Sequence, residues 1–573
     1  MDSNVHEKER GITIMSKYTR LYYRNYTLHV VDTPGHADFS GEVERILSMV
    51  DGVVLLVDAS EGAMSQTKFV LSKALSANKK AIVVLNKIDR EGHRAQEVEN
   101  EIFDLFFSLT TREDLLEYPV VYASAKQGWV STSIDNLPGQ DVKPLLDLIV
   151  SHFPPASDTE KVDSPFAMSV NTIQTDPHLG RIVTGKVETG IASIGSPIKV
   201  IGRLGENKFS ESKITKLFYL EGLSRVDVNS AHAGEIVSLA GCDAGVTDTV
   251  CSPQCADPIP TIPLSPPILS MTFGPNDSPI AGKEGTKLTS SAIKERLAKE
   301  VENNVTLSLS PANDSESINV QGRGELQIGI LVETMRREGF ELTVSPPNIL
   351  SVFDEKDQVS KEPFEEVLVD IDPDLQGIVI DQMSDRRGNL IEFREIGNRA
   401  RLVFHAPSRG LLGFRHEILS ATRGAATVNS SFSHYDVVKA SDFAGLKKGK
   451  LVSMDSGKTT GYALSMIEER GSLFVSIGEE VYEGMVVGET ARTGALDVNP
   501  CKAKRVTNMR STGAEEQVRL TPPKKMTVEE LISYMDDDEV LEVTPKNVRL
   551  RKKILDSGAR ARWAKTQKQR GNS

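Results

Sequence analysis

Three short polar segments in the first quarter of the chain each follow an apolar run and carry groups that can bind a nucleotide. The first of them, D-T-P-G-H at residues 32–36, comes directly after the apolar run Leu28–Val31. A carboxylate such as Asp32 can hold Mg²⁺ through water, and Gly35 lets a backbone N–H approach a γ-phosphate. The imidazole of His36 stands where a side chain can orient an attacking water. On its own, this segment is also an ordinary turn between a strand and a helix.

The other two segments carry groups that suit guanine. N-K-I-D occupies residues 86–89 and ends one apolar run, and S-A-K ends the next. The Asp89 carboxylate can accept two hydrogen bonds from N1 and N2 of guanine, which adenine does not supply. The aliphatic stem of Lys87 can lie along the base, and Asn86 can brace the neighbouring loops. A backbone N–H can meet guanine O6 in the third segment, which consists of Ser124, Ala125 and Lys126.

These segments require a sheet whose strand ends meet at one edge. Four short apolar runs, rich in β-branched residues, are typical of strands buried on both faces: Leu28–Val31, Val53–Val57, Ala81–Leu85 and Val120–Tyr122. Apolar residues recur at helical spacing between these runs. We therefore predict that residues 1–155 form a doubly wound parallel α/β domain, in which ligands bind beyond the carboxyl ends of the strands.

The rest of the chain predicts further domains, so the expected fold class is multidomain α/β and β. Glycines punctuate short Val/Ile/Thr runs over residues 164–257, which is typical of a β-barrel. Residues 268–350 predict a small α+β domain, and residues 362–438 show the β-α-β-β-α-β order of a ferredoxin-like domain. We expect the first of these two to be ferredoxin-like as well. Residues 441–573 predict a mostly β domain with a basic tail.

Composition narrows the class of protein. The 573 residues hold 39% hydrophobic residues and no apolar stretch long enough to cross a membrane as a helix. Four cysteines do not make a disulfide framework, which suits a reducing compartment. The net charge is −13, yet ten basic residues and one acidic residue stand between Lys546 and Ser573. An acidic body with a basic tail predicts a polyanionic partner for the tail, or a tail that is merely solvated.

The three polar segments resemble the motifs of translation-factor GTPases. R-G-I-T-I at residues 10–14 fits the same class, in which the threonine, Thr13 here, coordinates Mg²⁺ and senses the γ-phosphate. The domain order is similar to that of elongation factor G. Five further motifs resemble the TypA/BipA family, and the resemblance runs along essentially the whole chain: L-T-P-P-K at 520–524, E-V-T-P-K at 542–546, R-L-R-K-K at 549–553, Q-G-R-G-E-L at 321–326 and S-R-G-L-L-G at 408–413.

This resemblance implies a ribosome-associated GTPase that hydrolyses GTP to GDP and phosphate, with Mg²⁺, to switch its binding to the ribosome. It implies a role in ribosome assembly or in stress-adapted translation, with GTP, GDP, the ribosome and rRNA as partners and no membrane. The water-orienting role of His36 rests on the same resemblance. We expect a monomer in the cytoplasm, or in a plastid or mitochondrion if a transit peptide is missing. RNA contacts are expected at five basic residues, near the stacking surface of Trp563: Arg409, Arg549, Arg551, Lys552 and Lys553.

One departure from the family pattern concerns the phosphates. The motif G-x-x-x-x-G-K-[ST], whose amides and lysine cradle phosphates, does not occur in the sequence. S-G-K-T at 456–459 has Val452 in place of the first glycine and lies in the wrong domain, so we interpret it as a turn.

We accordingly expect the N-terminus to be incomplete, lacking a first strand, the phosphate loop and a first helix. The strands Leu28–Val31 and Val53–Val57 would then lose a shared neighbour and expose apolar faces. Two alternatives remain open: a nucleotide-free ribosome-binding protein that has lost GTPase activity, and a LepA-like translation factor, which the tail motifs disfavour.

Overall fold

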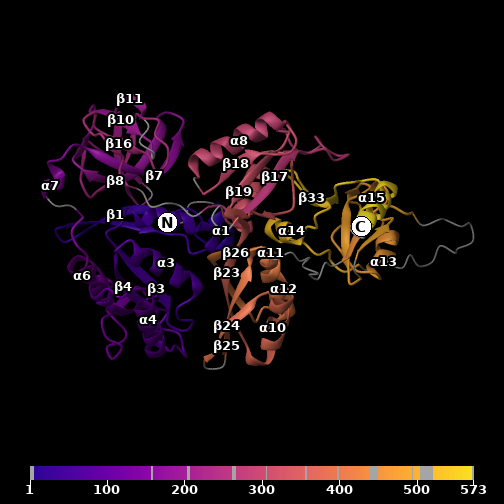
Figure 1. Ribbon diagram of the computed structural model, residues 1–573, viewed down its shortest axis with the longest axis horizontal. Helices are drawn as coiled ribbons and strands as arrows, with labels where there is room; N and C mark the ends of the chain where they lie inside the picture. The colour runs from indigo at the N-terminus through magenta and orange to yellow at the C-terminus, as the bar shows by residue number, and fades with distance from the viewer. Residues whose placement is uncertain are drawn as a thin grey trace, which may run out of the picture.

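The computed structural model is a series of sheets, each with its own apolar core, that follow one another along the chain (Figure 1). It describes residues 5–156, 159–202, 207–222, 224–260, 266–304, 306–354, 358–396, 399–438, 449–492, 494–503 and 520–570. Within this described part, no helix is both long and apolar enough to span a membrane. The multidomain α/β and β architecture expected from the sequence is confirmed.

The first unit contains a four-stranded sheet in the order β3-β4-β5-β6, whose first three strands are parallel. Its strands are β3 (Gly52–Asp58), β4 (Lys80–Asn86), β5 (Val120–Ser124) and β6 (Trp129–Ser131). Strand β4 is almost fully buried, because helices cover both faces of the sheet. The helices of the unit are α1 (Val5–Arg10), η1 (Ala37–Phe39), α2 (Ser40–Leu47), α3 (Ser65–Ser76), α4 (Ala95–Leu109), α5 (Glu113–Leu116) and α6 (Lys143–His152).

The first of the four predicted apolar runs, Leu28–Val31, lies outside this sheet. Strands β1 (Lys17–Tyr23) and β2 (Tyr26–Asp32) form a separate antiparallel hairpin, and β2 does not pair with β3 among the described residues. Val30 on β2 is 40% exposed and Leu56 on β3 is 63% exposed. These are the exposed apolar positions expected when the two strands lack a common neighbour between them.

The second unit is an antiparallel sheet of eight strands in the order β11-β10-β16-β7-β8-β15-β12-β13. Its inner face is packed with buried Val, Ile and Leu residues. At Gly185 a side chain would overlap the Ser169 carbonyl of the next strand, so only glycine fits there. The elements of the unit are α7 (Thr159–Val162), β7 (Ala167–Asp176), β8 (Gly180–Thr189), β9 (Ile191–Ser193), β10 (Pro197–Ile201), β11 (Asn207–Lys213), β12 (Lys216–Glu221), β13 (Ser224–Val228), β14 (Ser230–His232), β15 (Ile236–Ala240) and β16 (Thr249–Cys251).

The third unit has strands in the order β18-β19-β17-β20, with β33 and β34 from near the C-terminus added beyond β20. Helix α8 begins at a threonine cap, because the Thr289 side chain accepts a hydrogen bond from the Ala292 N–H. The elements are β17 (Leu269–Pro275), α8 (Ser290–Asn303), β18 (Ser308–Pro311), β19 (Ile318–Gly322), α9 (Glu325–Arg337), β20 (Leu342–Val344), β21 (Asn348–Ile349), β33 (Glu539–Val543) and β34 (Val548–Lys552).

The fourth unit has an antiparallel sheet in which β23 pairs with both β25 and β26, and β25 pairs with β24. Helices α10 and α12 pack against the sheet around buried residues such as Val367, Phe404 and Ile418. The elements are β22 (Val352–Asp354), β23 (Val359–Ile371), η2 (Pro373–Leu375), α10 (Gln376–Asp385), β24 (Asn389–Ile396), β25 (Arg399–Pro407), α11 (Ser408–Leu411), α12 (Phe414–Ala421) and β26 (Thr427–Val437).

The C-terminal unit combines a four-stranded sheet, β29-β31-β27-β32, with the short pair β28-β30. The S-G-K-T segment lies at β28, away from the first unit. Helix α14 begins with a capping box formed by Thr527 and Glu530. The elements are β27 (Gly449–Ser453), β28 (Gly457–Lys458), α13 (Gly461–Glu468), β29 (Ser472–Leu473), β30 (Glu480–Val481), β31 (Val486–Thr490), β32 (Ala495–Val498), α14 (Val528–Tyr534) and α15 (Ser557–Arg570).

Candidate functional site

The predicted guanine-binding residues meet at the carboxyl ends of β4 and β5. The Asn86 Oδ1 atom accepts a hydrogen bond from the backbone N–H of Ala125 at 2.9 Å, which ties the two loops together. The Ser124 side chain is buried beneath this loop, and its Oγ accepts a hydrogen bond from the Gln127 N–H. Asp89 and Lys126 are both exposed. The structure therefore presents a carboxylate and an ammonium group at the rim of loops that are already braced.

Lys87 links this edge to the neighbouring strand. Its backbone has a φ of +63°, in the left-handed region, and its Nζ lies 2.6 Å from Oδ2 of Asp58 at the end of β3. Burial raises the pKa of Asp58, but the hydrogen bonds from Lys87 and from the Ser60 N–H outweigh burial, so the pKa lies below its ordinary value. The ends of β3, β4 and β5 are thus joined by ionic and backbone hydrogen bonds.

The predicted Mg²⁺ residues lie on the separate hairpin. Asp32 is the last residue of β2, is exposed, and stands opposite Lys17, the first residue of β1. Thr13 lies four residues before Lys17 in a half-buried segment. The buried Glu7 carboxylate fixes this segment by accepting hydrogen bonds from the N–H groups of Ile14 and Met15. Thr13 and Asp32 therefore belong to the same end of one hairpin.

His36 lies between the first unit and two others. Its Nδ1 is 3.4 Å from Oδ1 of Asp38, and its Nε2 is 3.4 Å from a guanidinium nitrogen of Arg415 in the first turn of α12. Asp38 in turn caps helix α9 of the third unit, because its Oδ2 accepts hydrogen bonds from the N–H groups of Leu326 and Gln327 at 2.8 and 3.3 Å. The segment after Gly35 is therefore held by residues of the third and fourth units.

The electrostatics of Asp38 favour its charged form. Burial raises the pKa of Asp38, but the hydrogen bond with His36 and those from the helix N-terminus outweigh burial, so the pKa lies below its ordinary value. A side chain at Gly324 would overlap the Asp38 carboxyl, so glycine at this position leaves room for the external cap. Beside it, the buried Arg323 guanidinium lies 3.1 Å from the buried Glu44 carboxylate of α2.

Neither Asp38 nor Arg415 was among the residues predicted from the sequence. The sequence feature related to Asp38 is the Q-G-R-G-E-L motif, which places Gly324 directly before a helix. The motif does not show which side chain approaches that glycine. Asp38 lies 288 residues before Leu326, so its role as a cap of α9 cannot be recognised from local spacing.

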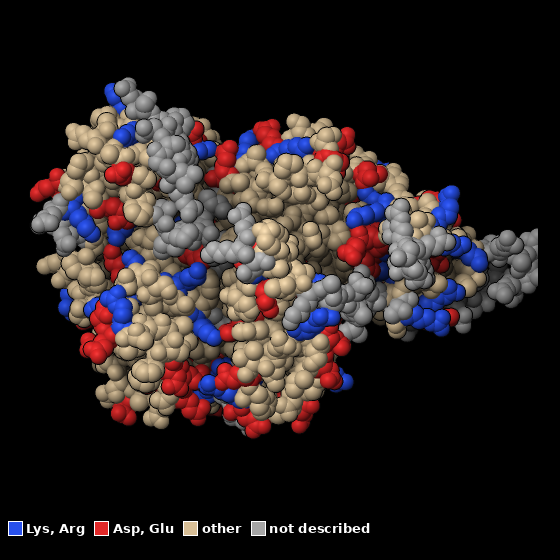
Figure 2. Space-filling view, in the orientation of Figure 1, with Lys and Arg blue, Asp and Glu red and all other residues tan. Residues whose placement is uncertain are grey.

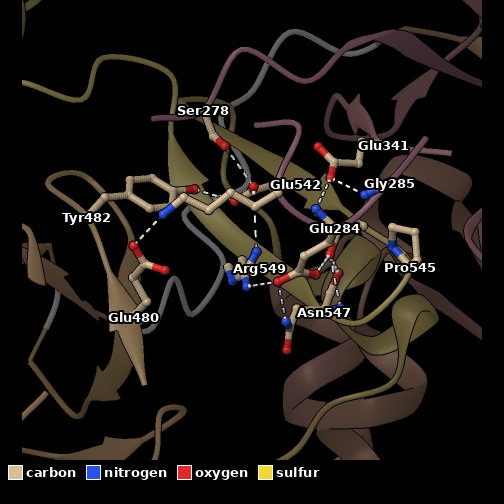
Figure 3. Close-up of polar contacts among 12 residues, drawn as sticks. Ser278, Glu284, Gly285, Glu341, Glu480, Tyr482, Glu542, Pro545, Asn547 and Arg549 are labelled. Atoms are coloured by element: carbon tan, nitrogen blue, oxygen red, sulfur yellow. Dashed lines mark hydrogen bonds and ion pairs between the residues drawn. The ribbon is translucent and has the colours of Figure 1, made fainter. Parts of the chain in front are cut away.

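The expected RNA contacts at Arg549, Arg551 and Lys552 need correction. All three side chains are buried on β34. Figure 3 shows the Arg549 guanidinium between two carboxylates, 3.0 Å from Glu284 and 3.6 Å from Glu542. These side chains are engaged with carboxylates of the same chain, because β34 lies between the third and C-terminal units rather than in a solvated tail.

The partners of the other corrected residues are acidic too. Arg551 forms an ion pair with Asp277, and Lys552 forms ion pairs at 2.9 Å with both Asp538 and Glu539. The Tyr482 hydroxyl donates a hydrogen bond of 2.6 Å to Glu542 (Figure 3). Burial and the neighbouring Glu542 carboxylate raise the pKa of Tyr482. This network joins the C-terminal unit to the third unit.

The remaining expected RNA contacts are closer to the surface. Arg409 is half-buried and lies 2.5 Å from Glu362, and Lys553 is exposed. Beyond them, helix α15 is rich in basic residues and has no separate apolar and polar faces. Trp563 on this helix is 48% exposed, beside the exposed Arg562 and Lys565. Lys and Arg side chains gather over the C-terminal unit, at the right of Figure 2.

Comparison with known proteins defines the class first. Residues 1–155 match the family described as the elongation factor Tu GTP binding domain, and residues 359–444 match the elongation factor G C-terminus. Residues 448–557 match the TypA/BipA C-terminal domain. These are the domains of translation-factor GTPases.

Full-length relatives narrow the class to one family. The chain is 43% identical to a Bacillus subtilis protein over 100% of this chain and 93% of that protein. It is 41% identical to a Salmonella typhimurium protein over 99% of this chain and 93% of that protein, and 42% identical to an Escherichia coli K12 protein over 98% and 92%. All three are named large ribosomal subunit assembly factor BipA. The chain belongs to the TypA/BipA family, which confirms the resemblance in the sequence motifs.

Proposed function

We propose that this protein is a ribosome-associated GTPase of the TypA/BipA type that acts in assembly of the large ribosomal subunit. The observation that carries the proposal is the similarity, along the whole chain, to proteins named large ribosomal subunit assembly factors. The braced loops at the ends of β4 and β5 support the same proposal from the structure.

The guanine base would be recognised by the exposed Asp89 carboxylate, with the Lys87 stem along the base. Asn86 would keep the loop of Ser124, Ala125 and Lys126 in position to offer a backbone N–H. Because that loop is held before ligand binds, less conformational entropy is lost on binding.

The phosphate side would be formed by the hairpin and the segment that follows it. The Thr13 hydroxyl and the Asp32 carboxylate are oxygen ligands of the kind that Mg²⁺ takes, so the donor set fits this ion. When bound, Mg²⁺ neutralises charge on the phosphate oxygens. The Gly35 N–H would reach the γ-phosphate, and His36 would orient the attacking water once its contact with Arg415 is released.

The C-terminal unit would contact rRNA. The basic residues of α15, with Trp563 available for stacking on an unpaired base, support this role better than the buried residues of β34. Lys553 and Arg409 remain proposed contacts. Because phosphate contacts release counterions, binding to ribosomes should weaken steeply as salt rises. We further propose that the protein acts as a monomer in the cytoplasm.

A base-specificity switch tests the nucleotide site. In the Asp89→Asn variant the amide can donate to the O2 atom of xanthine but can no longer accept both guanine protons. We expect the variant to bind GTP about a hundredfold more weakly than the parent and to gain binding of XTP, as measured by equilibrium titration. The control is Asp104→Asn, which removes another exposed carboxylate from the same unit.

Unchanged GTP affinity in Asp89→Asn would refute the assignment of Asp89. Ribosome co-sedimentation by a protein that binds no GTP would instead support the alternative of a nucleotide-independent ribosome-binding protein.

A further inference from the structure

A cavity of about 880 Å³ lies where the first, third, fourth and C-terminal units meet. It is lined by Asp38 after the D-T-P-G-H segment, Glu325 of α9, Glu365 of β23 and Ser533 of α14. Its volume is within the range of sites that enclose small organic molecules. None of the residues 86–89 or 124–126 lines the cavity, so it is separate from the guanine edge, whereas Gly35 and His36 of the D-T-P-G-H segment do line it.

Two carboxyl groups in this cavity lack a compensating charge. Among the residues that the structure describes, neither Glu325 nor Glu365 has an ion-pair partner. The Oε2 atom of Glu325 accepts a hydrogen bond from the Ser533 hydroxyl, whereas its Oε1 atom is out of contact with solvent and has no hydrogen-bond partner. A buried carboxylate oxygen without a partner is costly, which points to a group that is bound there in solution.

Nearby negative charges also make ionisation of these two carboxyls unfavourable. Burial, together with the neighbouring Asp38 and Glu365 charges, raises the pKa of Glu325 to about 7, although the hydrogen bond from Ser533 lowers it. Burial also raises the pKa of Glu365, although hydrogen bonds with Ser408 and Ser430 lower it. A cation in the cavity would relieve this repulsion.

Three basic side chains of the cavity wall form ion pairs with carboxylates, and a fourth, Arg415, contacts His36. Lys68 forms an ion pair with Glu366 at 2.9 Å, and Lys73 and Arg323 both pair with Glu44. None of these ion pairs includes Glu325 or Glu365, so negative charge is in excess around these two carboxyls, and this part of the cavity disfavours a phosphate group as its ligand.

The carboxyls of the cavity do not belong to a convergent group of metal ligands among the described residues. Over the described ranges, the one acidic group whose ligand atoms converge closely enough to hold an ion is Asp536, Asp538 and Glu539, which does not line the cavity. Apolar side chains such as Leu411 and Val428 also line the cavity. Carboxyls and apolar side chains that line one cavity match an aliphatic chain that bears ammonium groups.

We propose that the cavity binds a linear aliphatic polyamine. Its ammonium groups are received by the carboxylates of Glu325 and Glu365, and its methylene chain lies along the apolar wall. Because the cavity is bounded by four units, an occupied cavity holds those units together. The proposal concerns the part of the cavity around Glu325 and Glu365. Gly35 and His36, which we propose for the phosphate side of the nucleotide site, line the same cavity, so the titration below is done without nucleotide.

Calorimetric titration of the full chain with spermidine tests the proposal. The key variant is Glu325→Gln/Glu365→Gln, in which each amide keeps the shape of the side chain but removes its charge. The control is Glu113→Gln/Glu117→Gln, which makes the same change in net charge at two exposed positions of the first unit. Salt is kept near 0.15 M so that general attraction to an acidic protein is screened.

We expect one spermidine per chain, affinity lowered about tenfold or more in the cavity variant, and affinity unchanged in the control. Spermidine should also raise the melting temperature of the parent and of the control but not that of the cavity variant. The melting curve without ligand shows that the cavity variant is folded.

Three results would overturn the proposal. These are absence of binding to the parent, equal affinity in both double variants, and displacement of spermidine by an equal concentration of Mg²⁺ alone. Since the titration contains no nucleotide and no ribosomes, its outcome is independent of whether the protein hydrolyses GTP.

Discussion

Replacing Gly324 by alanine should separate the D-T-P-G-H segment from the third unit. The new methyl group would overlap the Asp38 carboxyl, which caps α9 through the N–H groups of Leu326 and Gln327. Alanine adopts the backbone conformation of Gly324 without strain, because its φ of −164° is extended. Any cost therefore comes from the lost contact rather than from the backbone.

The magnitude follows from the bonds that Asp38 makes. A hydrogen bond to a charged acceptor contributes about 1.5–3 kcal/mol, and loss of a helix cap costs about 1 kcal/mol by itself. Since the displaced carboxylate is buried, we expect Gly324→Ala to lower the free energy of unfolding by about 2–3 kcal/mol.

Urea denaturation measures this loss, and hydrogen exchange at the amides of Leu326 and Gln327 localises it. The control is Gly377→Ala in α10, where a methyl group would meet no atom within 4 Å. A second variant, Asp38→Ala, removes the group that the methyl would strike.

If the reasoning is right, Gly324→Ala and Asp38→Ala are not additive, because either change alone abolishes the cap. Additive losses, or a Gly324→Ala protein as stable as Gly377→Ala, would refute the role given to this contact.

Two further outcomes are expected. Arg549→Met should lower the free energy of unfolding by about 3–5 kcal/mol and expose the C-terminal unit to limited proteolysis, because it leaves the half-buried Glu284 and the buried Glu542 without this cationic partner. The control is the exposed Lys553→Met, and equal stability of the two variants would contradict the buried role of Arg549. The raised pKa of Glu325 predicts that the folded state binds its proton more tightly than the unfolded chain does, so stability that is fully present below pH 4.5 should fall by up to about 3 kcal/mol as pH rises to about 7. Unfolding measured from pH 4.5 to 8 should show this slope in the parent and a flatter one in Glu325→Gln, whereas parallel curves would exclude an effect of this carboxyl.

The sequence was most informative where the local pattern determines the structure. The run Ala81–Leu85 predicts a buried strand, and β4 occupies Lys80–Asn86, because a continuous apolar run is stable only with cover on both faces. The N-K-I-D and S-A-K segments stand at strand ends, as predicted, and Asn86 bonds to the second of them. The roles of these residues in nucleotide binding remain predictions.

The hairpin strand β1 was not predicted, since K-Y-T-R-L-Y-Y mixes polar and aromatic residues without a clear buried face. Its side chains instead contact the second unit, where Tyr18 bonds to Thr184 and Ser238. Where a segment mixes polar and apolar residues, contacts with distant parts of the chain determine whether it forms a strand.

The basic residues of β34 were also misjudged from the sequence, because their partners are distant along the chain. A run of arginines and lysines near a terminus is usually solvated, so the sequence favours a surface role. Arg549 is buried because Glu284, which is 265 residues earlier, supplies a carboxylate at the position that β34 reaches. Charge pairing over that separation is not visible in composition or spacing.

The addition of β33 to the third unit has a consequence for biosynthesis. Val344 pairs with Leu541, so a strand made late in translation completes a sheet whose other strands emerged much earlier. The fourth unit and most of the C-terminal unit lie between β20 and β33 along the sequence. Until they have left the ribosome, β20 has an unpaired edge, and closing this long-range contact carries a large entropic cost. Nascent chains that stall before residue 539 should therefore expose a strand edge that holdase chaperones recognise, and the finished protein should fold more slowly than its separate units would.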